Sequence, residues 1–191
     1  MRECRARLGP AERIAAAQGL ADQLERLPDF LVDRRIAGYW AVNGEIPLHV
    51  AVGRLARRGQ TFLLPVVGSG RRLRFAEFHP AMPVRPNRFG IPEPVVEDIA
   101  ALVAPEDLDL VLVPLLAFDR RGNRLGHGGG YYDTSFAFLR DGARPAGTLL
   151  VGVGLACQEV AAIEPEHWDV PLDFIATERE LIPCTAPIEQ S

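Results

Sequence analysis

The sequence contains no lysine, and all 21 of its basic residues are arginine. This absence excludes a lysine Schiff base, a lysine general base and the lysine of a Walker A phosphate loop. Cysteine is scarce: Cys4, Cys157 and Cys184 show no paired spacing, which predicts free thiols in a reducing compartment. No stretch reaches the roughly twenty apolar residues of a membrane span, and the first residues lack the apolar core of a signal peptide. We therefore expect a cytoplasmic protein without a membrane partner.

Length and charge narrow the class further. A chain of 191 residues is expected to form one domain, residues 1–191. Its content of 48% hydrophobic and 24% charged residues is typical of globular proteins. The formal charge of -4 argues against a general nucleic-acid binder, because such binding depends on an excess of basic residues. We expect a monomer that acts on small molecules.

The hydrophobic pattern predicts an α/β fold. Strands are expected at residues 35–42, 61–67, 73–78, 108–116, 148–155 and 171–177. Helices are expected at residues 10–27, 47–58, 96–104 and 131–140. The proline-rich stretch 80–94 is expected to be an ordered loop. Because two of the strands are unbroken apolar runs, the sheet should be mostly parallel, with helices on both faces. Ligands bind such sheets beyond the carboxyl ends of the strands, where residues 43–45, Asp119 and a glycine-rich segment are expected to meet.

The glycine-rich segment covers residues 122–133, and five of its twelve residues are glycine. Glycine lets backbone N–H groups approach a ligand closely, and a strand–turn–helix arrangement directs these groups at phosphate. A flexible linker is the plain alternative, but a linker rarely carries such chemistry. Positive charge, planar rings and a hard oxygen ligand for Mg²⁺ surround this turn, from Arg120, Arg121, Arg124, Tyr131, Tyr132 and Asp133. The pattern favours a nucleotide site.

Residues 124–133, Arg-Leu-Gly-His-Gly-Gly-Gly-Tyr-Tyr-Asp, resemble the signature of the 5-formyltetrahydrofolate cyclo-ligase family, also called methenyltetrahydrofolate synthetases. Weaker similarities follow in the same order as in the family, at residues 43–46, 64–67, 89–94, 168–173 and 177–178. Together they cover most of residues 8–180. The resemblance implies a single domain with an architecture like that of the NagB, RpiA and CoA-transferase proteins.

The resemblance also implies a reaction, in which ATP and Mg²⁺ drive ring closure of 5-formyltetrahydrofolate to 5,10-methenyltetrahydrofolate, with release of ADP and phosphate. The ATP phosphates would be wrapped by Arg124, Leu125, Gly126, His127, Gly128, Gly129, Gly130, Tyr131 and Tyr132, of which Arg124 and Tyr132 would serve catalysis. Asp133 and Asp173 match the two Mg²⁺ ligands. Glu45 matches the residue that contacts the pterin, and Tyr132 and Phe89 would line the folate site. Arg2 and Arg5 would replace a basic residue that reaches ATP from an N-terminal helix of the family.

Each assignment has a structural alternative. Asp133 would also stabilise the first turn of a helix, Asp173 could be a surface strand residue, and Glu45 could precede a helix. Two other functions stay open. One is a nucleotide- or folate-binding paralogue without activity, and the other is a sugar-phosphate isomerase or CoA-transferase-like enzyme, which would rest on fold analogy alone.

Overall fold

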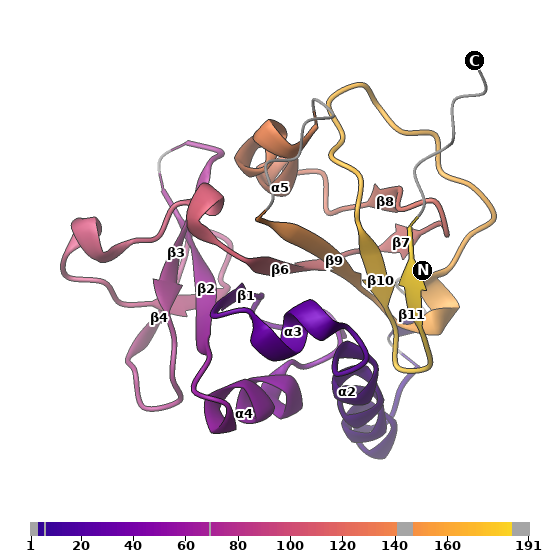
Figure 1. The fold of residues 1–191 in the computed structure, drawn as a ribbon, viewed down its shortest axis with the longest axis horizontal. Helices are drawn as coiled ribbons and strands as arrows, with labels where there is room; N and C mark the ends of the chain where they lie inside the picture. The colour runs from indigo at the N-terminus through magenta and orange to yellow at the C-terminus, as the bar shows by residue number, and fades with distance from the viewer. Residues whose placement is uncertain (1–3, 6, 69, 141–146, 185–191) are drawn as a thin grey trace.

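The computed structural model describes residues 4–5, 7–68, 70–140 and 147–184. Their centre is a seven-stranded sheet with the strand order β11-β10-β9-β6-β1-β2-β3 (Figure 1). Its strands are β1 (Arg35–Ala37), β2 (Thr61–Val67), β3 (Leu73–Glu77), β6 (Leu110–Pro114), β9 (Leu149–Val153), β10 (Phe174–Ala176) and β11 (Leu181–Pro183). The five inner strands pair in parallel, whereas β3 and β11 pair antiparallel at the two edges. The predicted mostly parallel sheet is confirmed.

The middle of this sheet is buried on both faces. In β6, Leu110 and Leu112 pack into one hydrophobic cluster, while Val111 and Val113 pack into a second one. The neighbouring strand β9 alternates in the same way. Strands that are buried on both faces lose the alternation of apolar and polar residues, which is why the sequence of both strands is a continuous apolar run.

Helices cover both faces, as predicted, but unequally (Figure 1). The first cluster is covered by α2 (Pro10–Leu24), α3 (Pro28–Val32) and α4 (His49–Arg57). The second is covered by the single turn α5 (Tyr131–Ser135) and the 3-10 turn η3 (Ala137–Leu139). The predicted helix at 131–140 therefore divides at Phe136, whose ring is fully buried against the sheet.

The first helix begins as the sequence predicts. Gly9 is its N-cap, Pro10 occupies the first helical position, and the Glu12 carboxylate accepts a hydrogen bond from the Gly9 amide at 2.7 Å. Ile14 is 64% exposed, so this apolar residue does not lie on the buried face of the helix. The helix ends at Leu24, before the predicted end at residue 27, and Pro28 opens α3.

Two other predictions of local structure are wrong. Residues 80–94 are not only a loop, since β4 (Val84–Pro86) and β5 (Pro92–Pro94) pair as an antiparallel hairpin. The Asn87 side chain holds its tip by accepting from the amides of Phe89 and Ile91. At 96–104 only the 3-10 turn η1 (Ile99–Ala101) forms. The remaining elements are η2 (Pro105–Asp107), η4 (Ala156–Gln158) and the hairpin β7 (Ala117–Phe118) with β8 (Arg124–Leu125).

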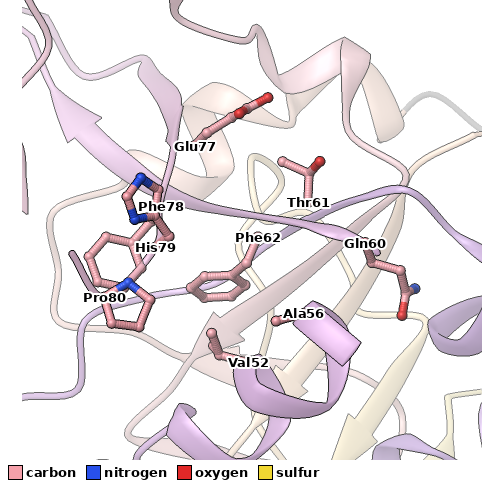
Figure 2. A pocket seen from close by; sticks show the side chains of 9 residues that line it. All are labelled: Val52, Ala56, Gln60, Thr61, Phe62, Glu77, Phe78, His79 and Pro80. Carbon is pink, nitrogen blue, oxygen red and sulfur yellow. The ribbon is translucent and has the colours of Figure 1, made fainter. Parts of the chain in front are cut away.

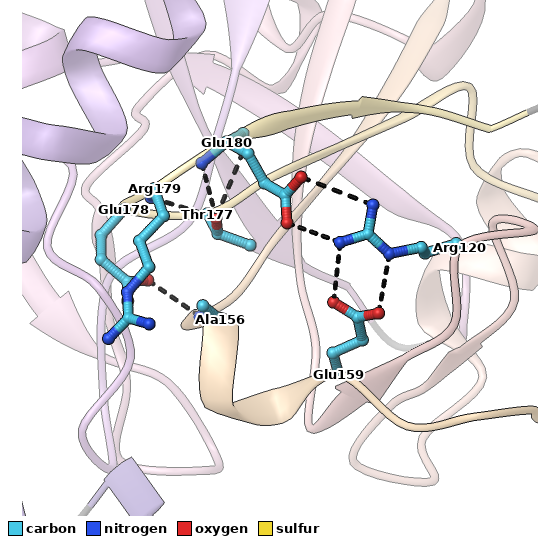
Figure 3. Close-up of polar contacts among 7 residues, drawn as sticks. All are labelled: Arg120, Ala156, Glu159, Thr177, Glu178, Arg179 and Glu180. Atoms are coloured by element: carbon cyan, nitrogen blue, oxygen red, sulfur yellow. Dashed lines mark hydrogen bonds and ion pairs between the residues drawn. The ribbon is translucent and has the colours of Figure 1, made fainter.

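The turn between β10 and β11 is held by its own side chains (Figure 3). The Thr177 hydroxyl accepts from the amides of Arg179 and Glu180, and it donates to the Glu180 carbonyl. Nearby, Arg120 bridges the carboxylates of Glu159 and Glu180. These side chains therefore stabilise the fold.

The structure joins Cys4 and Cys157 in a disulfide, with their Cα atoms 6.5 Å apart. The expectation of free thiols is therefore wrong for these two residues and holds for Cys184. The sequence spacing did not reveal the pair because 153 positions separate its members. Within the part of the chain that the structure describes, no helix is long and apolar enough to cross a membrane.

Candidate functional site

The glycine-rich loop follows β8 and leads directly into α5. Gly128 has a φ of 83° and Gly130, the N-cap of α5, a φ of 64°, both in the left-handed region that favours glycine. A Cβ added at Gly128 would meet nothing within 4 Å, so this side of the loop is open. Because α5 has only five residues, its dipole is short, and any attraction for phosphate must come mainly from the loop amides and nearby arginines.

Glu45 lies beyond the carboxyl end of β1, after a turn in which Asn43 and Gly44 both have positive φ. It is only 8% exposed. Its Oε2 accepts from the Val42 amide at 2.9 Å, while its Oε1 lies 3.7 Å from Arg5 Nη1 and 3.8 Å from Nε2 of His127. The structure therefore brings Glu45 together with the glycine-rich loop and with Arg5.

The environment of Glu45 alters the titration of several groups. Burial raises the pKa of Glu45, and the Val42 hydrogen bond and the charge of Arg5 only partly oppose this. Burial also raises the pKa of Tyr132, with the Glu45 charge as a second cause. Tyr39 donates its hydroxyl to the Ile46 carbonyl at 2.8 Å, and burial together with Glu45 raises its pKa as well. Both tyrosines therefore keep their hydroxyl protons.

Arg124 and Asp133 form a pair under the loop. Arg124 Nη2 lies 2.5 Å from Asp133 Oδ1, and Nη1 donates to the Val170 carbonyl. The Val170 amide donates to the same Asp133 oxygen at 3.2 Å. With its side chain 8% exposed, Arg124 fixes the position of Asp133. Among the described residues both hydrogen bonds to Asp133 end on Oδ1, which fits a metal ligand that uses Oδ2.

Asp173 immediately precedes β10, and its carboxylate accepts from the Leu150 amide at 2.8 Å. Residues 4–5, 7–68, 70–140 and 147–184 contain no cluster of three or more His, Cys, Asp or Glu that could hold a metal. Mg²⁺ often takes one or two carboxylates together with phosphate oxygens and water, so Asp133 beside a nucleotide suits this ion. The assignment of both aspartates stays a prediction.

Arginines that the sequence did not single out lie beside the loop. Arg88 donates to the Tyr131 hydroxyl, and its guanidinium lies 5.1 Å from the Phe89 ring centroid and 5.9 Å from that of Tyr131. Arg71 Nη1 lies 4.0 Å from the point that a Cβ on Gly130 would occupy. Phe89 is 55% exposed and meets Tyr131 edge to face. Only the folded chain brings these residues to the loop, since Arg88 is 43 positions from Tyr131 in the sequence and Arg71 is farther from the loop still.

One expected residue is placed elsewhere. Asp119 is buried in the turn between β7 and β8, where its carboxylate binds the turn and the Ile163 amide. The expectation that it joins the ligand cleft is therefore wrong. Arg2 lies outside the described residues.

A cavity of about 210 Å³ lies apart from this site (Figure 2). Val52 and Ala56 of α4 form one wall, and the rings of Phe62 and Phe78 line another. It opens where β2 begins, at the amino edge of the parallel strands. Ligands of such sheets bind at the opposite edge, where Glu45 and the glycine-rich loop lie.

Comparison with known proteins identifies the family. The model of the 5-formyltetrahydrofolate cyclo-ligase family matches residues 1–178. The chain belongs to this family. It is 32% identical to the 5-formyltetrahydrofolate cyclo-ligase of Haemophilus influenzae, over 90% of each chain. Its identity to that of Escherichia coli K12 is 31%, over 93% of this chain and 96% of the relative.

A solved structure agrees with the sequence relatives. The 5,10-methenyltetrahydrofolate synthetase of Aquifex aeolicus matches with a TM-score of 0.78 and 30% identity, covering 100% of this chain and 92% of that one. The recognition made from residues 124–133 is thus confirmed, as is the α/β fold. The expected likeness to the NagB, RpiA and CoA-transferase proteins stays a prediction.

Proposed function

We propose that this enzyme closes the ring of 5-formyltetrahydrofolate to 5,10-methenyltetrahydrofolate, using ATP and Mg²⁺ and releasing ADP and phosphate. The observation that carries the proposal is the 3.8 Å between His127 Nε2 in the glycine-rich loop and Glu45 Oε1. A loop suited to phosphate and a carboxylate suited to ring N–H groups are thereby side by side. Family membership supports the same reaction.

The chemistry explains why both sites must adjoin. A formamide carbonyl is a poor electrophile, and its oxygen is a poor leaving group. Transfer of the γ-phosphoryl group from ATP to this oxygen, with ADP leaving, gives an iminium phosphate. N10 then attacks the activated carbon and loses its proton, and the carbon–oxygen bond breaks to release phosphate. The enzyme needs mainly to align the formyl oxygen with the γ-phosphorus and to stabilise charge there.

The residues divide this work. Residues 124–132 would hold the phosphates, with Arg71 and Arg88 adding positive charge at the edge of the loop. Glu45 would accept hydrogen bonds from adjacent N–H groups of the pterin, and Tyr132 and Phe89 would contact the folate. Asp133, with Asp173 as the second predicted ligand, would hold Mg²⁺, which neutralises phosphate charge when it is bound. The sequence has no lysine, so arginines would supply the side-chain cations at the phosphates, beside the loop amides.

The test is incubation of the purified chain with 5-formyltetrahydrofolate, ATP and Mg²⁺. We expect near-UV absorbance of the conjugated methenyl product only when all three are present, with one ADP formed per product. Omission of ATP and omission of Mg²⁺ are the controls. If both substrates bind but no product forms, the chain is a paralogue without activity.

A further inference from the structure

The guanidinium of Arg5 is an unusual group in this protein. Its residue is 1% exposed, and Nε, Nη1 and Nη2 are buried without a hydrogen-bond partner among the described residues. The charged group near it is the Glu45 carboxylate, whose Oε1 lies 3.7 Å from Nη1. A buried cation without hydrogen bonds is costly, so its opposite charge must account for its place in the fold.

Several contacts fix the segment that carries Arg5. Cys4 is bonded to Cys157, and the Arg5 carbonyl accepts from Arg13 Nη2 at 3.4 Å. The Arg5 Cβ packs against the turn before Glu45, because a Cβ added at Gly44 would lie 3.2 Å from it. Arg5 is therefore enclosed beside the turn that precedes Glu45, whereas the phosphate loop is open at Gly128.

We propose that Arg5 is a positioning residue that holds the Glu45 carboxylate as an oriented anion for the folate ring and makes no contact with ATP. The proposal rests on the proposed function and replaces the expectation that Arg5 reaches ATP. The groups facing Glu45 are Arg5, His127, Tyr39 and Tyr132, and within this set Arg5 alone is charged at every pH of interest.

The physical reason is the burial of Glu45. Burial raises the pKa of Glu45, and the Arg5 charge opposes the rise. Without that charge the pKa rises further, so the carboxylate takes up a proton at a higher pH. A protonated carboxyl cannot accept the same pair of hydrogen bonds from ring N–H groups. A variant with an uncharged residue in place of Arg5 should therefore lose folate binding on acidification, and it should do so at a higher pH than the wild type.

The experiment measures KM for 5-formyltetrahydrofolate and for ATP between pH 5.5 and 8.5 in the wild type, Arg5→Met and Arg5→Lys. The control is Arg7→Met, which removes an exposed arginine two positions away. At pH 7 we expect Arg5→Met to raise the folate KM about tenfold, the effect of losing one charge interaction, and to leave the ATP KM within about twofold. Its folate KM should rise at a higher pH than in the wild type as the pH is lowered. Arg5→Lys should restore most of the affinity.

A rise in the ATP KM with an unchanged folate KM would overturn the proposal, and so would no change in either. If Arg5→Met does not fold, Arg5→Lys and the pair Arg5→Met/Glu45→Gln, compared with Glu45→Gln, decide instead. In the Glu45→Gln background the loss of Arg5 should leave the folate KM unchanged, and a further tenfold rise would contradict a role through Glu45. Failure of the wild type itself to form product would instead count against the proposed function.

Discussion

Asp119 and Glu45 are both buried carboxylates in loops that follow strands, at 1% and 8% exposure, yet their surroundings are opposite. Asp119 accepts six hydrogen bonds, from Arg121, Asn123 and Ile163. Burial alone would raise the pKa of Asp119, but these hydrogen bonds lower it below its ordinary value. Glu45 accepts one hydrogen bond among the described residues, from Val42, and its pKa is raised.

The difference separates a carboxylate that builds the fold from one that is kept for a ligand. A fully bonded carboxylate has no capacity left, and removing it strands several donors. A carboxylate with few hydrogen bonds in a buried place costs stability and retains lone pairs for a partner. The sequence shows both residues as carboxylates that follow strands, and it does not show their hydrogen bonds. This is why both were expected in one cleft.

The largest effect is expected from Asp119→Ala. It should lower the free energy of unfolding by about 3–5 kcal/mol, because buried amides and Asn123 lose their acceptor. Denaturant unfolding followed by circular dichroism measures this. Asp98→Ala, which removes an exposed cap with one hydrogen bond to the Ala100 amide, is the control and should cost about 1 kcal/mol. Equal losses of unfolding free energy in Asp119→Ala and Asp98→Ala would contradict the view that the hydrogen bonds of Asp119 build the fold.

Two glycines of the same segment allow the same comparison in the backbone. Gly122 and Gly128 both have positive φ, but a Cβ at Gly122 would lie 2.6 Å from the Leu172 carbonyl oxygen, whereas at Gly128 it would meet nothing within 4 Å. Gly122→Val should therefore cost about 3 kcal/mol of stability. Gly128→Val should cost about 1 kcal/mol, from backbone strain, and abolish measurable ATP binding with folate binding retained. Calorimetric titration with a non-hydrolysable ATP analogue is the decisive measurement. Unchanged nucleotide affinity would make the loop a structural turn.

The two predicted metal ligands, Asp133 and Asp173, should differ in how much activity is lost when each is replaced. Asp133→Asn should reduce kcat at least about a hundredfold at low Mg²⁺, or about 2.7 kcal/mol, because a neutral amide is a weak ligand. Asp173→Asn should lose less, since the Asp173 carboxylate already binds the Leu150 amide. Rates at graded Mg²⁺ concentrations distinguish the two residues. Equal losses would establish Asp173 as a second ligand, and wild-type rates for Asp133→Asn would remove Asp133 from the site.

The smallest effect concerns the pH dependence of stability. The folded-state pKa of Glu45 is raised above 4.5, so its contribution to stability is present below that pH and is lost as the pH rises through the folded pKa. The folded-state pKa of Asp119 is lowered below 3.8, so its contribution is present above that pH and is lost as the pH falls. The difference in unfolding free energy between wild type and Glu45→Gln should therefore fall as the pH rises, whereas the difference between wild type and Asp119→Asn should rise. Denaturant unfolding between pH 3 and 8 tests this, and slopes of the same sign would contradict it.

The central sheet was predictable because its strands carry a local signal. The strand at Thr61–Val67 has the predicted bounds, and the continuous apolar sequences of β6 and β9 predict strands that are buried on both faces. The edges were less predictable. β11 has three residues, and the β4–β5 hairpin is framed by prolines, so its pairing comes from Asn87 and from the neighbouring Glu93, which accepts from the Val67 amide.

Of the candidate site, the sequence predicted the glycine-rich loop and the closeness of Glu45 to it. It did not predict the burial of Arg5, the cation–π contacts of Arg88 or the position of Arg71. These depend on contacts between residues far apart in the chain, and an arginine has the same sequence signal whether it is buried or exposed. Asp119 was misplaced because a strand end can either present a residue to a ligand or use it to close a turn.

The bond between Cys4 and Cys157 encloses most of the chain in a covalent ring. A protease that cuts one peptide bond inside this ring opens it without separating the pieces. Trypsin can act here only after an arginine that is not followed by proline, and exposed arginines of this kind inside the ring include Arg71, Arg72 and Arg88. A chain nicked once at any of them should migrate as one species until it is reduced and then divide in two.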